Sequence, residues 1–180
     1  MSSKNKKIAI YIDGSNFYFS VKKTFQCKVD IEKFCKKLAK EKEIVKINYY
    51  ISPVGESNPQ MYVEQQKFFE KLKKIKNLKV VFGRLEKRKR DGNVYYVEKA
   101  TDVNLALDLA LDAQADVYDE AYLISNDGDF SEAVKAAIKR FNKKLFYVAI
   151  GNRSSISYHL KKVATATIKV DQVFISEVKI

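Results

Sequence analysis

The sequence contains few of the residues on which many enzymes depend. Its 180 residues include one histidine, His159, and only two cysteines, Cys27 and Cys35. These three side chains cannot build a disulfide framework or a four-ligand zinc site. The single histidine also excludes most Ser–His and Cys–His catalytic schemes and histidine-rich metal sites. Any hydrolytic chemistry in this chain must therefore rest on carboxylates.

Long apolar runs are missing as well. No stretch of 18 apolar residues occurs, and the lysines near the amino terminus precede only a six-residue apolar run. We therefore expect no transmembrane helix, no signal peptide and no membrane partner, and a cytoplasmic protein. Repeats and low-complexity tracts are absent. The length then predicts a single domain over residues 1–180.

Positive charge is in surplus. The chain has 34 Lys and Arg against 22 Asp and Glu, a formal net charge of +12. Such a surplus favours a polyanionic partner over a neutral metabolite, although it would also serve solubility. The apolar content of 46% fits a globular protein with a real core.

Buried-type strands alternate with amphipathic helical patterns along the chain. This alternation predicts an α/β fold with three α/β/α layers and a mostly parallel central sheet. The expected strands are 7–12, 44–51, 78–82, 121–124 and 144–150, with a last strand or extended segment at 167–175. The expected helices begin at Phe17, span 30–40, run for about 17 residues after Pro59, span 101–115, begin at Phe130 and span 156–161.

Two of these helices carry specific expectations about their buried sides. In the helix after Pro59, the expected core stripe is Tyr62, Gln65, Phe69, Leu72 and Ile75. In the helix 101–115, the residues expected to face the core are Val103, Ala106, Leu107 and Ala110. Asn104, Asp108 and Asp112 are expected on another side, at four-residue spacing.

Acidic residues stand where strands end and helices begin. The first strand ends at Asp13, the fourth strand leads into Asp127 and Asp129, and Asp102 lies in the first turn of a helix. Strand carboxyl ends and helix amino ends share one edge of a parallel sheet, so these carboxylates can converge. Next to Asp13, Gly14 would permit an unusual turn, and Ser15 or Asn16 would cap the following helix.

Helix capping is the simpler explanation for some of these acids. Asp129 followed by Glu132 matches a capping box, and Asp102 would suit a helix dipole. Four converging carboxylates would repel one another without a cation. Oxygen ligands of this kind suit Mg²⁺ or Mn²⁺, and Ser125 and Asn16 could add neutral oxygen ligands or position a water.

The segment 83–98 differs from the rest of the chain. Asp91-Gly92 between two short β-type runs predicts a β-hairpin or extended loop. A solvated hairpin tip is one explanation of its charge, and RNA phosphate binding is the other. The positive residues in question are Arg84, Lys87, Arg88, Lys89 and Arg90.

Three separated blocks, YIDGSNFY, EKATDVNLALDLAL and YLISNDGDFSEAVK, occur in this order on the β/α alternation. They resemble NYN-domain proteins of the LabA-like group in the PIN-like nuclease superfamily, and the late segment SYHLKKVATATIKVDQVF extends the resemblance over nearly the whole chain. The resemblance implies a PIN-like fold and a metal-dependent ribonuclease. Its acidic centre would be Asp13, Asp102, Asp127 and Asp129, with Asn16 beside it.

The chain departs from that pattern in small ways. Asn126 and Gly128 stand where Gly and Ser are more usual, and Ala100-Thr101 stand where Gly-Val is usual. None of these departures removes an acid.

Two other functional classes compete with the ribonuclease prediction. A phosphatase of the haloacid dehalogenase type needs a second acid two residues after the first, and here that position is Ser15. A catalytically silent RNA-binding or protein-interaction module would keep the fold and the charge but would not need all four acids. The predicted cofactor is Mg²⁺ or Mn²⁺, the predicted partner is single-stranded RNA, and a homodimer is compatible with the sequence.

Overall fold

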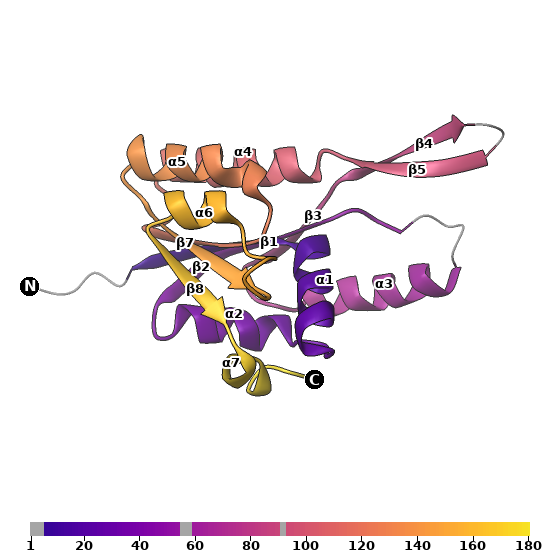
Figure 1. The fold of residues 1–180 in the computed structure, drawn as a ribbon, viewed down its shortest axis with the longest axis horizontal. Coiled ribbons are helices and arrows are strands. Elements are labelled where there is room, and N and C mark those ends of the chain that lie inside the picture. The colour runs from indigo at the N-terminus through magenta and orange to yellow at the C-terminus, as the bar shows by residue number, and fades with distance from the viewer. Residues whose placement is uncertain (1–5, 55–58, 91–92) are drawn as a thin grey trace, which may run out of the picture.

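A six-stranded, fully parallel sheet forms the centre of the molecule (Figure 1). The computed structural model describes residues 6–54, 59–90 and 93–180. The strand order across the sheet is β3-β2-β1-β6-β7-β8. The strands are β1 (Lys7–Asp13), β2 (Glu43–Ile51), β3 (Leu78–Phe82), β6 (Glu120–Ile124), β7 (Lys144–Ile150) and β8 (Ala166–Val170).

Helices cover both faces of this sheet, which confirms the three-layer α/β prediction. Figure 1 shows α4, α5 and α6 above the sheet and α2, α3 and α7 below it. The first group is α4 (Thr101–Gln114), α5 (Ser131–Lys139) and α6 (Tyr158–Val163), with the short 3-10 turn η1 (Gly128–Phe130) before α5. The second group is α2 (Ile31–Ala39), α3 (Pro59–Leu72) and α7 (Gln172–Ser176). Helix α1 (Gly14–Phe25) packs in the same core through Phe17 and Val21.

The central strand β1 supplies side chains to both cores. Successive side chains on a strand point to opposite faces. Ile8, Ile10 and Ile12 pack with the helices below the sheet, whereas Ala9 and Tyr11 pack with those above it. Both sets are fully buried. A strand buried on two faces appears in sequence as a continuous apolar run, which is why this strand was easy to predict.

Helix α4 buries a different side from the one predicted. Leu105, Leu109 and Ala113 face the core, while Val103 and Leu107 are 59% and 53% exposed. The prediction failed because α4 has apolar residues on more than one side, so periodicity alone does not select the buried face.

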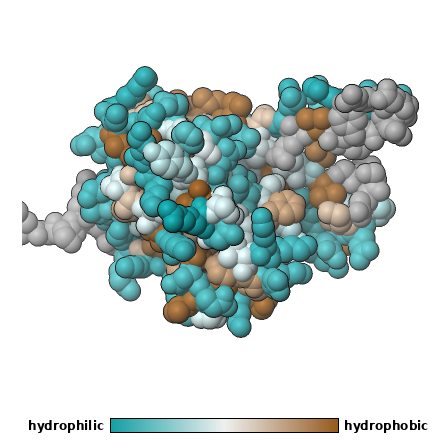
Figure 2. All heavy atoms as spheres, viewed as in Figure 1, coloured by the Kyte–Doolittle hydropathy of each residue, from teal (hydrophilic) through white to brown (hydrophobic). Residues whose placement is uncertain are grey.

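Apolar residues exposed on α4 form a strip at four-residue spacing, which comprises Val103, Leu107 and Leu111. Figure 2 shows hydrophobic residues along the upper rim of the molecule, where α4 runs. Within residues 6–54, 59–90 and 93–180, no helix is long and apolar enough to cross a membrane.

Helix α3 also differs from expectation. It ends at Leu72 after 14 residues, and Tyr62 is partly exposed and lies outside the core stripe. Gln65 donates a hydrogen bond to the Ser52 carbonyl and accepts one from the Val54 backbone N–H, so it secures the chain that follows β2.

The carboxyl-terminal tail is a strand followed by a helix. β8 ends at Val170, because the Asp171 side chain accepts a hydrogen bond from Phe174 N and caps α7. The predicted extension to residue 175 was therefore wrong in its second half.

The predicted hairpin is present as β4 (Arg84–Arg90) and β5 (Asn93–Lys99), an antiparallel pair that projects away from the sheet (Figure 1). The Asp91-Gly92 turn lies outside the described residues. At the base, a Cβ added to Gly83 would lie 2.1 Å from Thr101 Oγ1 and 2.7 Å from Ser52 Oγ. The start of the hairpin therefore packs directly against the first turn of α4.

Ala100, between β5 and α4, adopts a left-handed backbone with φ of 71°. Alanine in this region is disfavoured by about 1–2 kcal/mol, whereas glycine adopts it readily but loses more entropy on folding. We expect Ala100→Gly to stabilise the protein by about 0.5–1 kcal/mol, measured by chemical denaturation.

The matched control is Ala115→Gly at the other end of α4, where φ is −79°. This change should leave stability unchanged or lower it. A loss of stability in Ala100→Gly as large as in the control would contradict the strain at Ala100.

Candidate active site

The acids lie at the point where the sheet changes its direction of winding. β1 and β6 are neighbours, yet the helix after β1 covers the lower face and the helix after β6 covers the upper face. Their carboxyl ends therefore border the crevice in which open α/β sheets bind ligands. Asp13 is the last residue of β1, and Asp127 follows β6 by three residues.

Asp13 is held by two hydrogen bonds. Its Oδ1 accepts from Asn16 N at 3.0 Å, and its Oδ2 accepts from Ser125 Oγ at 2.9 Å. The second bond follows from strand register, because Ile12 pairs with Ile124 and the next residues stand side by side. The first bond makes Asp13 the cap of α1, which begins at Gly14. The expectation that Ser15 or Asn16 would be the cap was wrong, because the helix starts earlier.

Gly14 is required by close packing. A Cβ at this position would lie 2.4 Å from Tyr49 Cε1 and 2.8 Å from the Tyr50 carbonyl oxygen. Among the described glycines, only Gly151 has a positive φ, so the unusual turn expected at Gly14 is not observed. The absence of a side chain lets α1 begin directly against β2.

Asn16 connects α1 to the turn after β6. Its Oδ1 accepts from Asn126 N at 3.0 Å. Asn126 in turn donates from Nδ2 to the Ile150 carbonyl at 2.7 Å and accepts from the Tyr147 hydroxyl at 2.6 Å. The Tyr147 hydroxyl also accepts from Ser157 N at 3.0 Å. These bonds fix the ends of β6 and β7 relative to α1.

Sequence reasoning did not find the structural role of Asn126 or Tyr147. In the sequence Asn126 stands out only as a departure from a family pattern, and Tyr147 lies inside the predicted strand 144–150 without a role of its own. Their contact spans 21 residues and depends on the pairing of β6 with β7. No local spacing signals it.

The acidic turn 127–129 has one capping acid. Asp127 Oδ1 accepts from Asp129 N at 2.9 Å and caps η1. Residue Phe130 precedes α5 without a side-chain cap, and Glu132 pairs with Lys135 at 2.5 Å. The capping-box explanation of Asp129 was therefore wrong, and capping accounts for Asp127 instead.

Asp102 lies in the first turn of α4 and is exposed. Its neighbour Thr101 is buried, and Thr101 Oγ1 lies 3.2 Å from Ser52 Oγ at the end of β2. The helix start is therefore anchored to the sheet, while the Asp102 carboxylate remains accessible to solvent.

Three of the predicted acids interact electrostatically. Burial raises the pKa of Asp13 above its ordinary value of 3.8, and the charges of Asp102 and Asp127 raise it further, against the lowering effect of the Asn16 and Ser125 hydrogen bonds. Asp129 is exposed at the end of the same turn as Asp127.

This donor set has the chemistry of a Mg²⁺ or Mn²⁺ site, since it offers oxygen atoms alone. Within the described parts of the chain, however, no three His, Cys, Asp or Glu side chains stand close enough together to share one ion. The acids therefore lie at the same edge of the sheet, but their side chains are too far apart to bind one ion in the conformation described.

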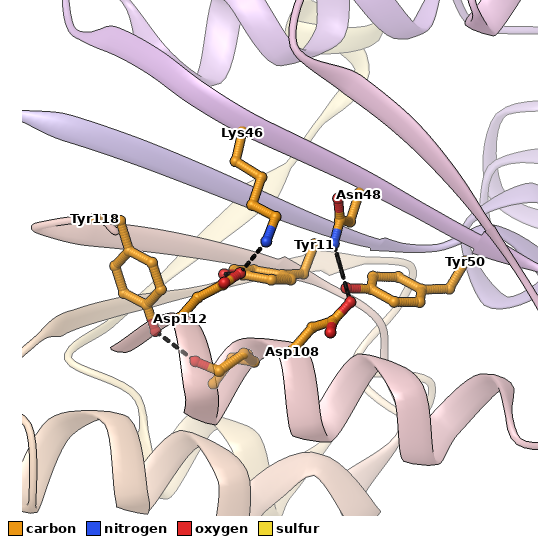
Figure 3. A network of polar contacts seen from close by, with 8 residues as sticks. Tyr11, Lys46, Asn48, Tyr50, Asp108, Asp112 and Tyr118 are labelled. Carbon is orange, nitrogen blue, oxygen red and sulfur yellow. Dashed lines mark hydrogen bonds and ion pairs between the residues drawn. The ribbon is translucent and has the colours of Figure 1, made fainter. Parts of the chain in front are cut away.

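Asp108 and Asp112 belong to a different network, farther along α4 (Figure 3). Asp112 Oδ2 accepts from the Tyr11 hydroxyl at 2.7 Å and pairs with Lys46 at 2.5 Å. Asp108 Oδ2 accepts from the Tyr50 hydroxyl at 2.8 Å. Burial raises the pKa values of both tyrosines, and the aspartates raise them further, so the hydroxyls stay protonated and donate. These aspartates attach α4 to the sheet.

The hairpin residues predicted to bind RNA fall on both sides of β4. Lys87 and Lys89 alternate with Arg84 and Arg88 along the strand, and all four are exposed. Arg88 pairs with Glu86 at 3.2 Å. The Arg90 side chain lies outside what the structure describes.

Comparison with known proteins identifies the family. The protein-family model described as "NYN domain" matches residues 7–171 of the sequence. The chain belongs to the NYN-domain family. NYN domains are PIN-like, nuclease-type domains, generally nucleases, and usually use divalent metals. The family prediction is confirmed at this level.

A solved structure shares the fold of this NYN domain. A Vibrio parahaemolyticus protein, described as being of unknown function, superposes with a TM-score of 0.75 at 25% sequence identity. The match covers 100% of this chain and 99% of that one. No curated protein matches this sequence.

The raised pKa of Asp13 predicts how the stability of this NYN domain varies with pH. Because folding favours the protonated form, ionised Asp13 destabilises the fold, increasingly as pH rises from the ordinary value of 3.8 through the folded pKa. Asparagine is an equally good cap. In EDTA, we expect Asp13→Asn to unfold at or above the wild-type denaturant midpoint at pH 7, with a smaller advantage near pH 4.

The control is Asp171→Asn, which changes the exposed cap of α7. Its effect on stability should vary little over the same pH range. An Asp13→Asn variant that is less stable than wild type at pH 7, by the same amount as at pH 4, would show that Asp13 acts as a cap alone.

Proposed function

We propose that this NYN domain is a metal-dependent ribonuclease of the LabA-like group, formed by residues 1–180 as one domain. Its substrate is RNA, in single-stranded form. The observation that supports the proposal is that Asp102 and Asp127, from two other elements, lie near enough to Asp13 at the carboxyl edge of the sheet for their charges to raise its pKa.

The unfavourable environment of the ionised Asp13 carboxylate supports the presence of a bound cation. Asp13 is only 7% exposed, and its charge is opposed both by burial and by two neighbouring acids. Helix capping would not require three acids from separate elements to approach one another. A bound divalent ion would offset the repulsion, and Mg²⁺ or Mn²⁺ suits carboxylate oxygens.

When bound, such an ion polarises a phosphoryl oxygen and lowers the pKa of a bound water. The residues that would hold it are Asp13, Asp102, Asp127 and Asp129. Asp102 and Asp129 are exposed, so their side chains can turn toward a cation without unpacking the core.

Ser125 and Asn16 have positioning roles in this proposal. The Ser125 hydroxyl donates to Asp13 Oδ2 and accepts from Asp127 N at 3.1 Å, so it orients two of the acids at once. Asn16 holds the Asn126 backbone that leads into the acidic turn. Neither residue needs to contact the cation to support it.

The hairpin supplies the positive surface for the substrate. β5 ends at Lys99, three residues before Asp102, so the base of the β4–β5 hairpin is adjacent in sequence to one of the candidate acids. A strand of RNA that reaches the acids can therefore also lie along the exposed side chains of β4.

Cleavage assays should separate the site acid Asp102 from the structural acid Asp108. Loss of a group that only supports a metal ligand typically costs 10–100-fold, so we expect Asp102→Asn to lower cleavage of labelled single-stranded RNA by at least about 100-fold. Asp108→Asn should retain most of the activity but lose about 0.5–1.5 kcal/mol of stability through its Tyr50 bond.

The assay compares Mg²⁺, Mn²⁺ and EDTA below the melting temperature of both variants. Wild type should also melt higher with either cation, through mass action, and Asp102→Asn should gain less. Equal losses of cleavage in the two variants would place Asp108 in the site. A wild type that neither cleaves RNA nor responds to millimolar cations would leave the binding-module alternative.

The hairpin contribution can be measured from the salt dependence of RNA binding. Each phosphate contact to a single strand contributes about 0.7 to the slope of log K against log salt. Replacing Lys87 and Lys89 together with glutamine should therefore reduce the slope by about 1.4.

The control removes the same charge from Lys139 and Arg140, at the end of α5 that leads away from the acids. Its slope should match wild type. An unchanged slope in the hairpin variant would exclude this surface from RNA binding.

A further inference from the structure

An exposed aromatic pair, Tyr158 and His159, lies at the start of α6. Tyr158 is 70% exposed, although α6 itself packs against the core through a buried residue. Ser157 caps the helix by accepting from Leu160 N at 3.3 Å, and Leu160 is fully buried. The backbone that carries the pair is therefore fixed, while the two rings project from it.

One member of the pair, His159, lies against the acidic turn. A Cβ added to Gly128 would lie 3.4 Å from His159 Cδ2 and 3.5 Å from His159 Cβ. Gly128 stands between Asp127 and Asp129, so the imidazole packs over the middle of the turn that carries two of the four candidate ligands. This contact joins segments 31 residues apart, which is why the sequence showed His159 only as an isolated residue.

The two rings meet edge to face. Their centroids are 5.8 Å apart and their planes are at 80°. In such a pair one ring presents its edge to the other, so the contact leaves ring faces uncovered. An uncovered, rigidly mounted aromatic face is the feature that single-strand-binding proteins use to stack a base.

The surrounding charge favours a nucleotide. From Ile150 to Val170 the sequence contains no Asp or Glu, but it contains Arg153, Lys161, Lys162 and Lys169. The aromatic pair therefore belongs to a segment with a surplus of positive charge, and His159 in it lies close to Gly128 of the acidic turn. A strand whose phosphate reaches the acids can place an adjacent base on the rings.

We propose that Tyr158 and His159 form a base-stacking subsite for a nucleotide next to the phosphate that is cleaved. This inference rests on the proposed function for the position of the strand. It adds the class of contact, which is the face of an unpaired nucleobase. The subsite selects single-stranded RNA, because a paired base in a duplex is already stacked on its neighbours.

The absence of tryptophan from the chain allows a direct test. In Tyr158→Trp, the new indole is the sole tryptophan, and stacking on a base quenches its fluorescence. The titration uses a short single-stranded RNA in EDTA, where a metal-dependent enzyme does not cleave it. We expect saturable quenching by the RNA and little or none by an abasic ribose-phosphate strand of equal length.

The control reporter is Leu111→Trp, which places an exposed indole on α4, nine residues beyond Asp102. Its fluorescence should not change with RNA. Equal changes in both reporters, or equal quenching by the abasic strand, would overturn the subsite.

Affinity measurements on otherwise intact protein provide a second readout. Loss of one aromatic stacking contact typically weakens binding by about 5- to 150-fold, so we expect such a loss of RNA affinity in Tyr158→Leu. Tyr158→Phe should bind like wild type, because the ring is retained. The abasic strand should bind all three proteins equally.

The outcomes separate this inference from the proposed function. RNA binding without quenching in Tyr158→Trp overturns the subsite and leaves the ribonuclease proposal standing. Selective quenching in a protein that does not cleave RNA with Mg²⁺ or Mn²⁺ supports base stacking on Tyr158 and overturns both the ribonuclease proposal and the position of the stacked base beside a cleaved phosphate. A protein that does not bind RNA overturns both.

Discussion

The pairing of β1 with β6 is the constraint on which the acidic edge depends. It brings Asp13 beside Ser125. The Ser125 hydroxyl donates a hydrogen bond to Asp13 and accepts one from the Asp127 backbone N–H. A shift of the register by one residue would turn Asp13 to the opposite face of the sheet. The alternate burial of β1 side chains in two cores excludes that shift, because every isoleucine would exchange places with a neighbour of another size. Packing far from the acids thus fixes their geometry.

The two ends of α4 have separate roles. Its amino end presents Asp102 to solvent beside the base of the hairpin, and its later turns attach to the sheet through Asp108 and Asp112. Aspartate is therefore solvent-exposed at the amino end of α4, whereas farther along the helix it anchors α4 to the sheet by hydrogen bonds. Burial and hydrogen-bond partners distinguish these roles, and charge alone does not.

The sequence predicted the strands well and the faces of helices less well. Strands buried on both sides appear as apolar runs bounded by polar residues, so their positions follow from composition. Helix α4 has apolar residues on more than one side, and Asp108 and Asp112 select its buried side by accepting hydrogen bonds from Tyr50 on β2 and Tyr11 on β1. That selection depends on distances between strands, which periodicity does not contain. In the same way, the positions of the acids could be predicted from strand ends, while the Asn126–Tyr147 contact and the packing of His159 on Gly128 could not.

The placement of β6 has a consequence for synthesis of the chain. Residues 120–124 occupy the centre of the sheet, between β1 and β7, and pair with a strand about 110 residues earlier. Until this segment leaves the ribosome, β1 has one edge without its partner, and its run of isoleucine and tyrosine is the kind that pairs with other chains. Long-range parallel pairing of this kind also forms slowly. The edge of β1 that β6 covers in the folded protein therefore stays open to association with other chains until residues 120–124 have been synthesised.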